Sequence, residues 1–401
     1  MLSLASTKPA TAGATDNPDV VAFLTDPASL ALVEQLCAAR PEGRSRIVRK
    51  GGVQDAIRCL ARLATPPEVL IVDVSETDLP LSEIDRLADV CEPSVRVVVV
   101  GDREDVGLFR QLIRLGVADY IVKPLNVDLL LPHLSEGGAR VAVAGTRTGK
   151  LLVVTGARGG VGTTTIAANL GWLQANTRKR RVALIDLDFH NGALSAQLDL
   201  GAGELAEVLV GGSRRVDPLI VERTLRRHGP RLVLLSGELP LDRATAFDPE
   251  SLGQLVEVLE RQHHYVLVDL PRVPGAAYGY LLKRAAVRVI VGNRTLPAAR
   301  ALARLLDLVE GAPGRSVLVL NEDRPLAAGL VSRKALEEAL GRSFDVEIPY
   351  LKQAPLMGDN LGEPAVARRK SGFTQAIERL AAAIAGERLP PSGFWRRWRR
   401  G

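Results

Sequence analysis

The sequence lacks the features of a membrane-spanning, secreted or disulfide-stabilised protein. No window in its 401 residues approaches the roughly 20 consecutive apolar residues that a transmembrane helix needs. Residues 1–17 hold neither a basic segment nor an apolar stretch, so no secretory signal is expected. Only three cysteines occur, and their wide spacing suits reduced thiols better than a disulfide framework or a metal site. We therefore expect a cytoplasmic protein.

Charge and overall composition are typical of globular proteins and exclude few functional classes. Charged residues make up 24% of the chain and hydrophobic residues 46%, as in soluble globular proteins. The net charge of +6 permits an acidic partner such as a nucleotide, a nucleic acid or anionic lipid, but it selects none of them. The length favours two or three domains.

Short apolar runs alternate with helical patterns along most of the chain. Four runs in the first region predict strands, at 20–24, 69–72, 95–100 and 120–122. Six runs predict strands in a second region, at 151–154, 182–185, 232–235, 265–268, 287–291 and 317–320, with helices such as 250–261 and 297–310 between them. Such alternation indicates parallel sheets covered by helices, so the predicted fold class is α/β, with a doubly wound second sheet.

Composition marks the ends of these two regions. Residues 1–17 are expected to be disordered, and residues 135–149, rich in Gly, Ala, Arg and Thr, are expected to form a linker. Residues 388–401 form a basic, aromatic tail. The predicted domains are therefore 18–134 and 150–387.

A glycine-rich loop joins a predicted strand to a predicted helix at residues 156–165, which read Gly-Ala-Arg-Gly-Gly-Val-Gly-Thr-Thr-Thr. The N–H groups of such a loop point inward, and the following helix adds the positive end of its dipole, so the loop can hold a nucleotide phosphate. It fits the P-loop pattern except at Thr163, where a lysine is expected. For the loop alone, an ordinary strand-to-helix turn is the alternative.

Aspartates at the ends of two later strands strengthen the nucleotide interpretation. Asp186 and Asp188 end the run at 182–185, and Asp269 ends the run at 265–268. An acid in this position holds Mg²⁺ in nucleotide sites, directly or through water. Any one such acid is more often solvated or a helix cap, but the three motifs in this order favour a nucleotide site.

The second region resembles the deviant Walker A ATPases of the ParA/MinD superfamily, over about residues 150–387. The resemblance implies a dimer that sandwiches ATP with Mg²⁺. It assigns Mg²⁺ to Thr164 and, through water, to Asp269, and it gives Asp186 and Asp188 the catalytic role of orienting water and metal. The residues that it assigns to the nucleotide are Arg158, Gly159, Gly160, Val161, Gly162, Thr163, Thr164, Thr165 and Asn321, the last of them at adenine.

Two departures from the family pattern bear on activity. Thr163 stands where the family has the lysine that reaches the β and γ phosphates, and a threonine offers only a hydroxyl. Arg158 stands where the family has the lysine that reaches the partner subunit's nucleotide. Arginine keeps the charge but presents a planar fork in place of a point charge. We expect that ATP is bound and hydrolysed weakly; a degenerate site that binds nothing is the alternative.

The first region resembles a response-regulator receiver, which has a flavodoxin-like fold. Asp26 follows the first predicted strand, Asp73 ends the second at the phosphoryl-acceptor position, and Lys123 precedes a proline after the last. Thr25 takes one place of the usual acidic pair, and Gly101 replaces the Ser or Thr that responds to phosphorylation. We expect an atypical receiver used for docking or dimerisation; phosphorylation of Asp73 is the alternative.

The tail follows a Pro- and Gly-rich spacer and reads Phe-Trp-Arg-Arg-Trp-Arg-Arg at residues 394–400. As a helix it would place Trp395 and Trp398 on one face between arginines, which suits weak contact with an anionic inner-membrane surface. A solvated tail that packs on the body or on a partner is an equal alternative.

An atypical receiver followed by a ParA/MinD-like domain is the combination found in TadZ/CpaE-type proteins of Flp (Tad) pilus assembly, which this chain resembles over nearly its whole length. The resemblance implies a dimer that localises a pilus secretion machine, often at a cell pole, with a secretion ATPase among its partners. One alternative is a ParA-like partitioning ATPase that binds DNA nonspecifically, which the first region argues against. The other is a scaffold that needs no nucleotide.

Overall fold

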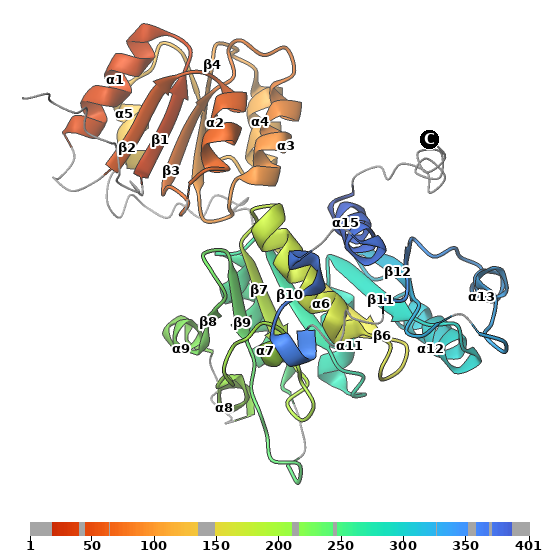
Figure 1. Cartoon of the computed structure of the whole chain (residues 1–401). Helices are drawn as coiled ribbons and strands as arrows, with labels where there is room; N and C mark the ends of the chain where they lie inside the picture. The colour runs from red at the N-terminus through yellow and green to blue at the C-terminus, as the bar shows by residue number, and fades with distance from the viewer. Residues whose placement is uncertain are drawn as a thin grey trace, which may run out of the picture. The chain divides into compact units, whose positions relative to one another are not determined.

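The computed structural model of the chain describes residues 18–39, 45–63, 65–134, 149–210, 216–243, 247–325, 327–351, 358–368 and 371–386. The chain divides into two compact units, Met1–Arg147 and Thr148–Gly401, here called the N-terminal unit and the C-terminal unit (Figure 1). Each has its own sheet and its own cores.

The N-terminal unit is a five-stranded parallel sheet in the order β2-β1-β3-β4-β5, with helices on both faces. This is the flavodoxin-like strand order. Its elements are β1 (Pro18–Leu24), α1 (Pro27–Ala38), β2 (Ser45–Lys50), α2 (Val53–Leu60), β3 (Val69–Asp73), α3 (Pro80–Val90), β4 (Arg96–Gly101), α4 (Val106–Arg114), β5 (Asp119–Val122) and α5 (Val127–Leu134).

Both faces of this sheet are covered, which explains its unbroken apolar strands. Every residue of β3 is buried, because one face packs under α1 and α5 and the other under α2, α3 and α4 (Figure 1). Strand β3 lies in the middle of the sheet, between β1 and β4, and Thr25, which follows β1, contacts Asp73 at its end. The central strands therefore bring Asp73 to the carboxyl edge, where ligands of such sheets bind.

The C-terminal unit is an eight-stranded sheet in the order β13-β12-β11-β6-β10-β7-β9-β8, parallel except for β8. Its strands are β6 (Lys150–Gly156), β7 (Val182–Asp186), β8 (Arg226–Arg227), β9 (Leu232–Leu235), β10 (Tyr265–Leu270), β11 (Val287–Gly292), β12 (Arg315–Asn321) and β13 (Val346–Ile348). Its α-helices are α6 (Thr163–Trp172), α7 (Leu194–Gln197), α8 (Leu205–Val210), α9 (Pro218–Thr224), α10 (Pro249–Glu260), α11 (Ala276–Arg284), α12 (Leu296–Leu308), α13 (Arg333–Leu340) and α15 (Gly372–Ala385). A π-helical turn (Leu173–Thr177) extends α6, and a 3₁₀ turn (Ala365–Ala367) precedes α15.

Two hydrophobic cores sandwich this second sheet. Helices α6 and α15 cover one face, through Ile166, Phe373 and Ile377 among others. Helices α10, α11 and α12 cover the opposite face, as in a doubly wound fold. The α/β class predicted from the sequence, with a flavodoxin-like sheet and a second doubly wound sheet, is therefore confirmed.

The sequence patterns missed three strands, β2, β8 and β13, and each lies at the edge of its sheet. Strand β2 is partly exposed and reads Ser-Arg-Ile-Val-Arg-Lys, so it has no apolar run to detect. Strands β8 and β13 have only two and three residues. None of the helices in the described ranges has an apolar stretch of membrane-spanning length.

Candidate functional site

The glycine loop of the C-terminal unit lies between β6 and α6, at the carboxyl edge of the sheet. Helix α6 begins at Thr163, with Gly162 as its N-cap. Gly160 and Gly162 have φ angles of +75° and +89°, which side-chain-bearing residues rarely adopt. Arg158, Gly159 and Gly160 are exposed and Val161 is buried. The loop is thus anchored by one apolar side chain and exposes its outer backbone to a ligand.

Asn321 at the end of β12 supports this loop directly. Its side-chain Nδ2 donates a hydrogen bond of 2.8 Å to the carbonyl oxygen of Val161. The φ angle of Gly162 favours glycine, and a Cβ atom there would lie 2.6 Å from the same nitrogen, so a side chain would displace Asn321 from the loop. The structure therefore places Asn321 beside the loop, on the side of β11 and β12.

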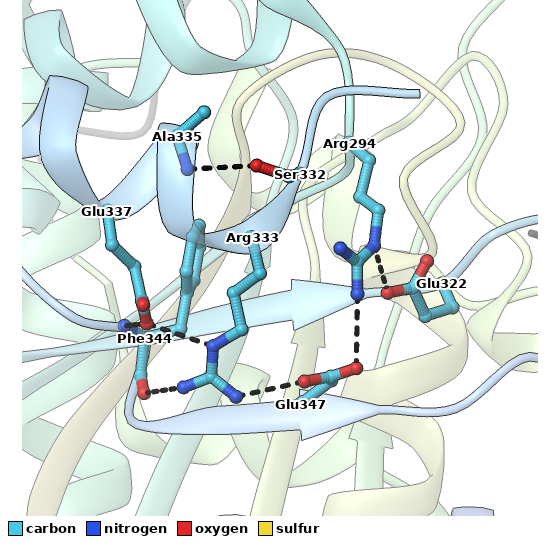
Figure 2. Close-up of polar contacts among 8 residues, drawn as sticks. All are labelled: Arg294, Glu322, Ser332, Arg333, Ala335, Glu337, Phe344 and Glu347. Atoms are coloured by element: carbon cyan, nitrogen blue, oxygen red, sulfur yellow. Dashed lines mark hydrogen bonds and ion pairs between the residues drawn. The ribbon is translucent and has the colours of Figure 1, made fainter. Parts of the chain in front are cut away.

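A charged network joins the segment after β11 to α13 and β13 (Figure 2). Arg294 forms ion pairs with Glu322, the residue after Asn321, and with Glu347 of β13. Arg333 on α13 reaches Glu347 at 2.9 Å and Glu337 at 2.9 Å. Because Arg294 and Glu322 are both largely buried, this network fixes the edge on which Asn321 stands.

Thr164 and Asp269 meet at the start of α6. The Thr164 hydroxyl donates a 2.6 Å hydrogen bond to Oδ2 of Asp269, which ends the apolar part of β10. Asp269 is opposite Val154 of β6 on one side and Asp186 of β7 on the other. Parallel register thus places two of the three sequence-predicted acids, Asp186 and Asp269, next to each other, and the Thr164 hydroxyl contacts Asp269.

Burial sets the protonation of these acids. Burial, reinforced by the negative charge of Asp186, raises the pKa of Asp269 to about 7. Burial also raises the pKa of Asp186 to about 6, although the backbone N–H groups of Asp188 and Leu194 donate to it and partly oppose the shift. Asp188 itself is half-buried and accepts a hydrogen bond from the N–H of Asn191.

These donors fit Mg²⁺ bound together with a nucleotide. Mg²⁺ prefers oxygen ligands and usually takes one or two protein carboxylates along with phosphate oxygens and water. Thr164 and Asp269 offer such oxygens, and a divalent cation would relieve the repulsion between Asp269 and Asp186. When bound, Mg²⁺ would stabilise charge on phosphate oxygens. Thr164 and Asp269 would hold it, with Asp186 beside them.

Thr163 and Arg158 occupy the two positions where a P-loop of this type carries lysine. Thr163 is half-buried at the first position of α6, and Arg158 is exposed on the loop. A further cation, Arg272, lies close to the loop, because its Nη1 donates a hydrogen bond to the carbonyl oxygen of Ala157. Sequence reasoning missed Arg272. The only signal would have been its place three residues after Asp269.

A second acidic site lies at the carboxyl edge of the N-terminal sheet, around Asp73. Both of its oxygens are engaged. Oδ2 accepts from the N–H and hydroxyl of Thr25 at 2.9 and 2.7 Å and from Lys123 at 2.6 Å. Oδ1 accepts from the N–H and hydroxyl of Ser75, at 2.9 and 2.7 Å. The Asp73 side chain has no exposed surface. Sequence reasoning missed Ser75, although a serine two residues after an aspartate often bonds to it.

Lys123 connects Asp73 to Asp26. Its Nζ lies 2.7 Å from Asp26, whose other oxygen caps α1 through the N–H of Ser29. Burial alone would raise the pKa of Asp73, but hydrogen bonds from Lys123, Ser75 and Thr25 outweigh burial and hold it below the ordinary value. For Asp26 burial also acts upward, and the bonds from Lys123 and Ser29 lower its pKa to about 2. Both acids are ionised around one lysine.

Tyr120 fills the space beside Gly101, where the sequence resemblance expects a hydroxyl side chain. A Cβ atom at Gly101 would lie 2.4 Å from the Tyr120 oxygen. That hydroxyl donates to the carbonyl of Arg103 at 3.0 Å and accepts from its N–H at 3.3 Å, and Tyr120 is buried. The side chain of Tyr120 therefore occupies the space at the end of β4 where a receiver would have the hydroxyl that responds to phosphorylation of Asp73.

The predicted membrane-contact residues, Trp395 and Trp398, lie outside the described residues, as do residues 1–17 and most of the predicted linker. Within the described ranges, no three His, Cys, Asp or Glu side chains converge as a metal site of their own. The loop, Thr164, Asp186, Asp269 and Asn321 are brought together in one unit, and Asp26, Asp73 and Lys123 in the other.

Comparison with known proteins identifies the larger unit. The septum site-determining protein MinD of Synechocystis sp. is 29% identical over 250 residues, which are 60% of this chain and 91% of that protein. The MinD cell division protein of Aquifex aeolicus has 25% identity and a TM-score of 0.50 over 60% of this chain and 98% of its own. The structure of a pilus assembly protein CpaE from Caulobacter crescentus CB15 matches 29% of this chain and 92% of its own, with 32% identity and a TM-score of 0.26. The profile of the CobQ/CobB/MinD/ParA nucleotide binding domain matches residues 152–384, and the chain belongs to this family.

Proposed function

We propose that the C-terminal unit binds ATP with Mg²⁺, dimerises around it and hydrolyses it slowly. One observation carries this proposal: the glycine loop, the Thr164–Asp269 contact and Asp186 meet at the carboxyl edge of the sheet, while position 163 lacks a cation. The loop and the oxygen ligands support binding. The missing charge limits catalysis.

Slow turnover follows from what Thr163 cannot do. A preorganised cation near the charge that develops on phosphate oxygens is worth on the order of 10²–10³ in rate. Thr163 offers a neutral hydroxyl on a short side chain at the start of α6. Binding depends less on that one cation, since backbone N–H groups, the helix dipole and Mg²⁺ also act on the phosphates.

Equilibrium binding of labelled ATP to the full chain tests the proposal directly. We expect saturable binding that requires Mg²⁺ and that Thr164→Ala weakens, because this change removes the hydroxyl beside Asp269. Thr163→Lys is expected to raise turnover. Absence of wild-type binding at millimolar nucleotide would exclude the proposal. If Thr163→Lys gives no gain while binding is unchanged, the deficit lies elsewhere in the site.

We further propose that the whole chain is a cytoplasmic localisation factor of a Flp (Tad) pilus machine, in which nucleotide state selects the partner. The support is the order of the units: a flavodoxin-like unit with Asp73, Asp26 and Lys123, then a MinD/ParA-type unit. The CpaE match is not part of this support, because its TM-score is 0.26. The partner would be a pilus secretion ATPase or another assembly protein.

Pilus counts and co-purification test this role in the source organism. Deleting the gene is expected to abolish surface pili or misplace them, and the tagged protein is expected to retain the secretion ATPase in an ATP-dependent manner. Normal piliation in the deletion strain would contradict the role. Salt-sensitive retardation of DNA by the purified protein would favour partitioning instead, and dimerisation without nucleotide would favour a scaffold.

The basic tail is proposed to add weak contact with the inner-membrane surface. Two tails in a dimer would bind anionic lipid more tightly than one, since the second attachment is intramolecular. Co-sedimentation with vesicles that contain anionic lipid should be stronger for the full chain than for residues 1–388. Equal sedimentation would remove the membrane role.

A further inference from the structure

The glycine loop has no lysine at position 163, yet an arginine from the segment after β10 contacts the second residue of the loop. Arg272 follows β10, and its Nη1 donates to the carbonyl oxygen of Ala157, the residue before Arg158 in the loop. Ala157 has no exposed surface, whereas Arg272 is exposed. One N–H group of the guanidinium is therefore bound to the loop, while the Arg272 side chain remains exposed.

Sheet register explains how Arg272 arrives there. Strands β10 and β6 pair in parallel, and the last register pair is Leu270 with Thr155. Two residues beyond that pair on each strand lie Arg272 and Ala157, so the two chains leave the sheet side by side. The contact is thus a continuation of the strand pairing and does not depend on a long, mobile loop.

Neighbouring contacts hold this segment in place. The Thr155 hydroxyl donates to the carbonyl of Leu270 at 3.1 Å and lies 3.2 Å from the hydroxyl of Tyr278 on α11. These buried contacts fix the start and the end of the turn that carries Arg272. Among the described residues, Arg272 has no carboxylate within ion-pair distance. Four of the five N–H donors of its guanidinium are not used by the contact with Ala157.

We propose that Arg272 binds the phosphates of the nucleotide and supplies, for binding, the positive charge that Thr163 cannot supply, while the catalytic position at the start of α6 stays uncharged. Arginine suits this task, because its planar fork can donate two parallel hydrogen bonds to phosphate oxygens while a third N–H stays on Ala157. The charge thus comes from the loop after β10, the strand that carries Asp269, and not from the first turn of α6. This inference rests on the proposed binding of ATP.

Nucleotide affinities of the full-length protein test the role of Arg272. Arg272→Ala is expected to weaken Mg²⁺–ATP binding about tenfold, as for loss of one charge-assisted hydrogen bond, and to affect AMP little. Arg272→Lys should keep part of the affinity. The matched control is Arg300→Ala, which removes an exposed arginine from α12 and should leave affinity unchanged. Melting temperatures of all variants check that the fold persists.

A double substitution separates charge replacement from a purely structural role. If Arg272 supplies the missing charge, Thr163→Lys should restore binding to the Arg272→Ala protein and add much less to the wild type. If Arg272 only fastens the turn, Thr163→Lys will shift both affinities equally, and the inference fails. Unchanged binding in Arg272→Ala also overturns it. Absence of ATP binding by the wild type would instead remove the proposed function itself, and the inference with it.

Discussion

Each sheet carries aspartates at its carboxyl edge, and the two groups are in opposite electrostatic states. In the N-terminal unit, Lys123 lies 2.6 Å from Asp73 and 2.7 Å from Asp26, so the fold supplies the cation. In the C-terminal unit, Asp186 and Asp269 are opposite each other on β7 and β10, and no cationic side chain of the described residues pairs with them.

The two sites differ in whether the fold itself neutralises the charge of the buried aspartate. Hydrogen bonds and a lysine hold the pKa of Asp73 below its ordinary value, so its charge is already compensated. Burial and mutual repulsion raise the pKa of Asp269 to about 7, so its charge is compensated only when a cation joins. The same strand-end position is thus neutralised within the fold in one unit and is left for the proposed cation in the other.

Substitution of Lys123, the cation of the N-terminal site, should have the largest effect on stability. Lys123→Met would leave Asp73 buried and ionised without its counter-charge, and should destabilise the N-terminal unit by about 3–5 kcal/mol. Hydrogen exchange of β3 and β4 peptides in the full chain measures this. The double variant Lys123→Met/Asp73→Asn should regain the part of the loss that comes from Asp73, because only Asp26 then lacks its counter-charge. If the double variant is as unstable as the single one, charge compensation is not what Lys123 provides.

The same kind of change in the C-terminal unit should have the opposite sign. Asp269→Asn removes a buried charge that repels Asp186, and in Mg²⁺-free buffer at pH 8 it should stabilise this unit by roughly 2–4 kcal/mol. It should also weaken Mg²⁺-dependent ATP binding. Exchange rates of β10 peptides report the stability, with the exposed Asp242→Asn as the control. If Asp269→Asn destabilises the unit in metal-free buffer, the negative charge of Asp269 is not what destabilises the folded C-terminal unit.

Acidification should change the stabilities of the two units differently, by a smaller amount than these substitutions do. For a buried acid with a raised pKa, the folded state binds the proton more tightly, so stability is lost as pH rises through the folded pKa. Asp186 and Asp269, at about 6 and about 7, predict that the metal-free C-terminal unit gains roughly 1–3 kcal/mol between pH 8 and pH 5.5. The lowered pKa values of Asp26 and Asp73 predict no change over this range, and a loss that begins as pH falls below about 4.

Regional hydrogen exchange, corrected for the intrinsic pH dependence, tests this contrast. Saturating Mg²⁺ with ATP should remove the pH slope of the C-terminal unit, because the cation takes over the role of the proton. A slope that is equal in both units, or one that survives Mg²⁺ and ATP, would contradict the assigned protonation.

The features that the sequence predicted are those set by local pattern. Apolar runs predicted the central strands, and with them the positions of Asp73, Asp186 and Asp269 at strand ends, because a buried parallel strand stops where polar residues begin. The glycine loop predicted the helix that follows it, which begins at Thr163 in the structure. These signals lie within a few residues and need no tertiary information.

What the sequence did not predict depends on contacts between distant segments. The approach of Arg272 to Ala157 follows from the register of β6 and β10, which are separated by more than 100 residues. The packing of Tyr120 against Gly101 requires the pairing of β4 with β5. Strand β13 is three residues long and is defined by its neighbour β12 rather than by its own composition.

The smallest effect is expected when a small phosphodonor is offered to Asp73. Both of its oxygens accept hydrogen bonds, its side chain has no exposed surface, and Tyr120 fills the space where a responding hydroxyl would stand. Incubation with acetyl phosphate and Mg²⁺ should therefore leave the intact mass unchanged, with Asp73→Asn as the matched control. An added phosphoryl group that is absent from Asp73→Asn would show that the cluster opens. The N-terminal site would then be a second ligand site, and the contrast between the two units would be one of degree.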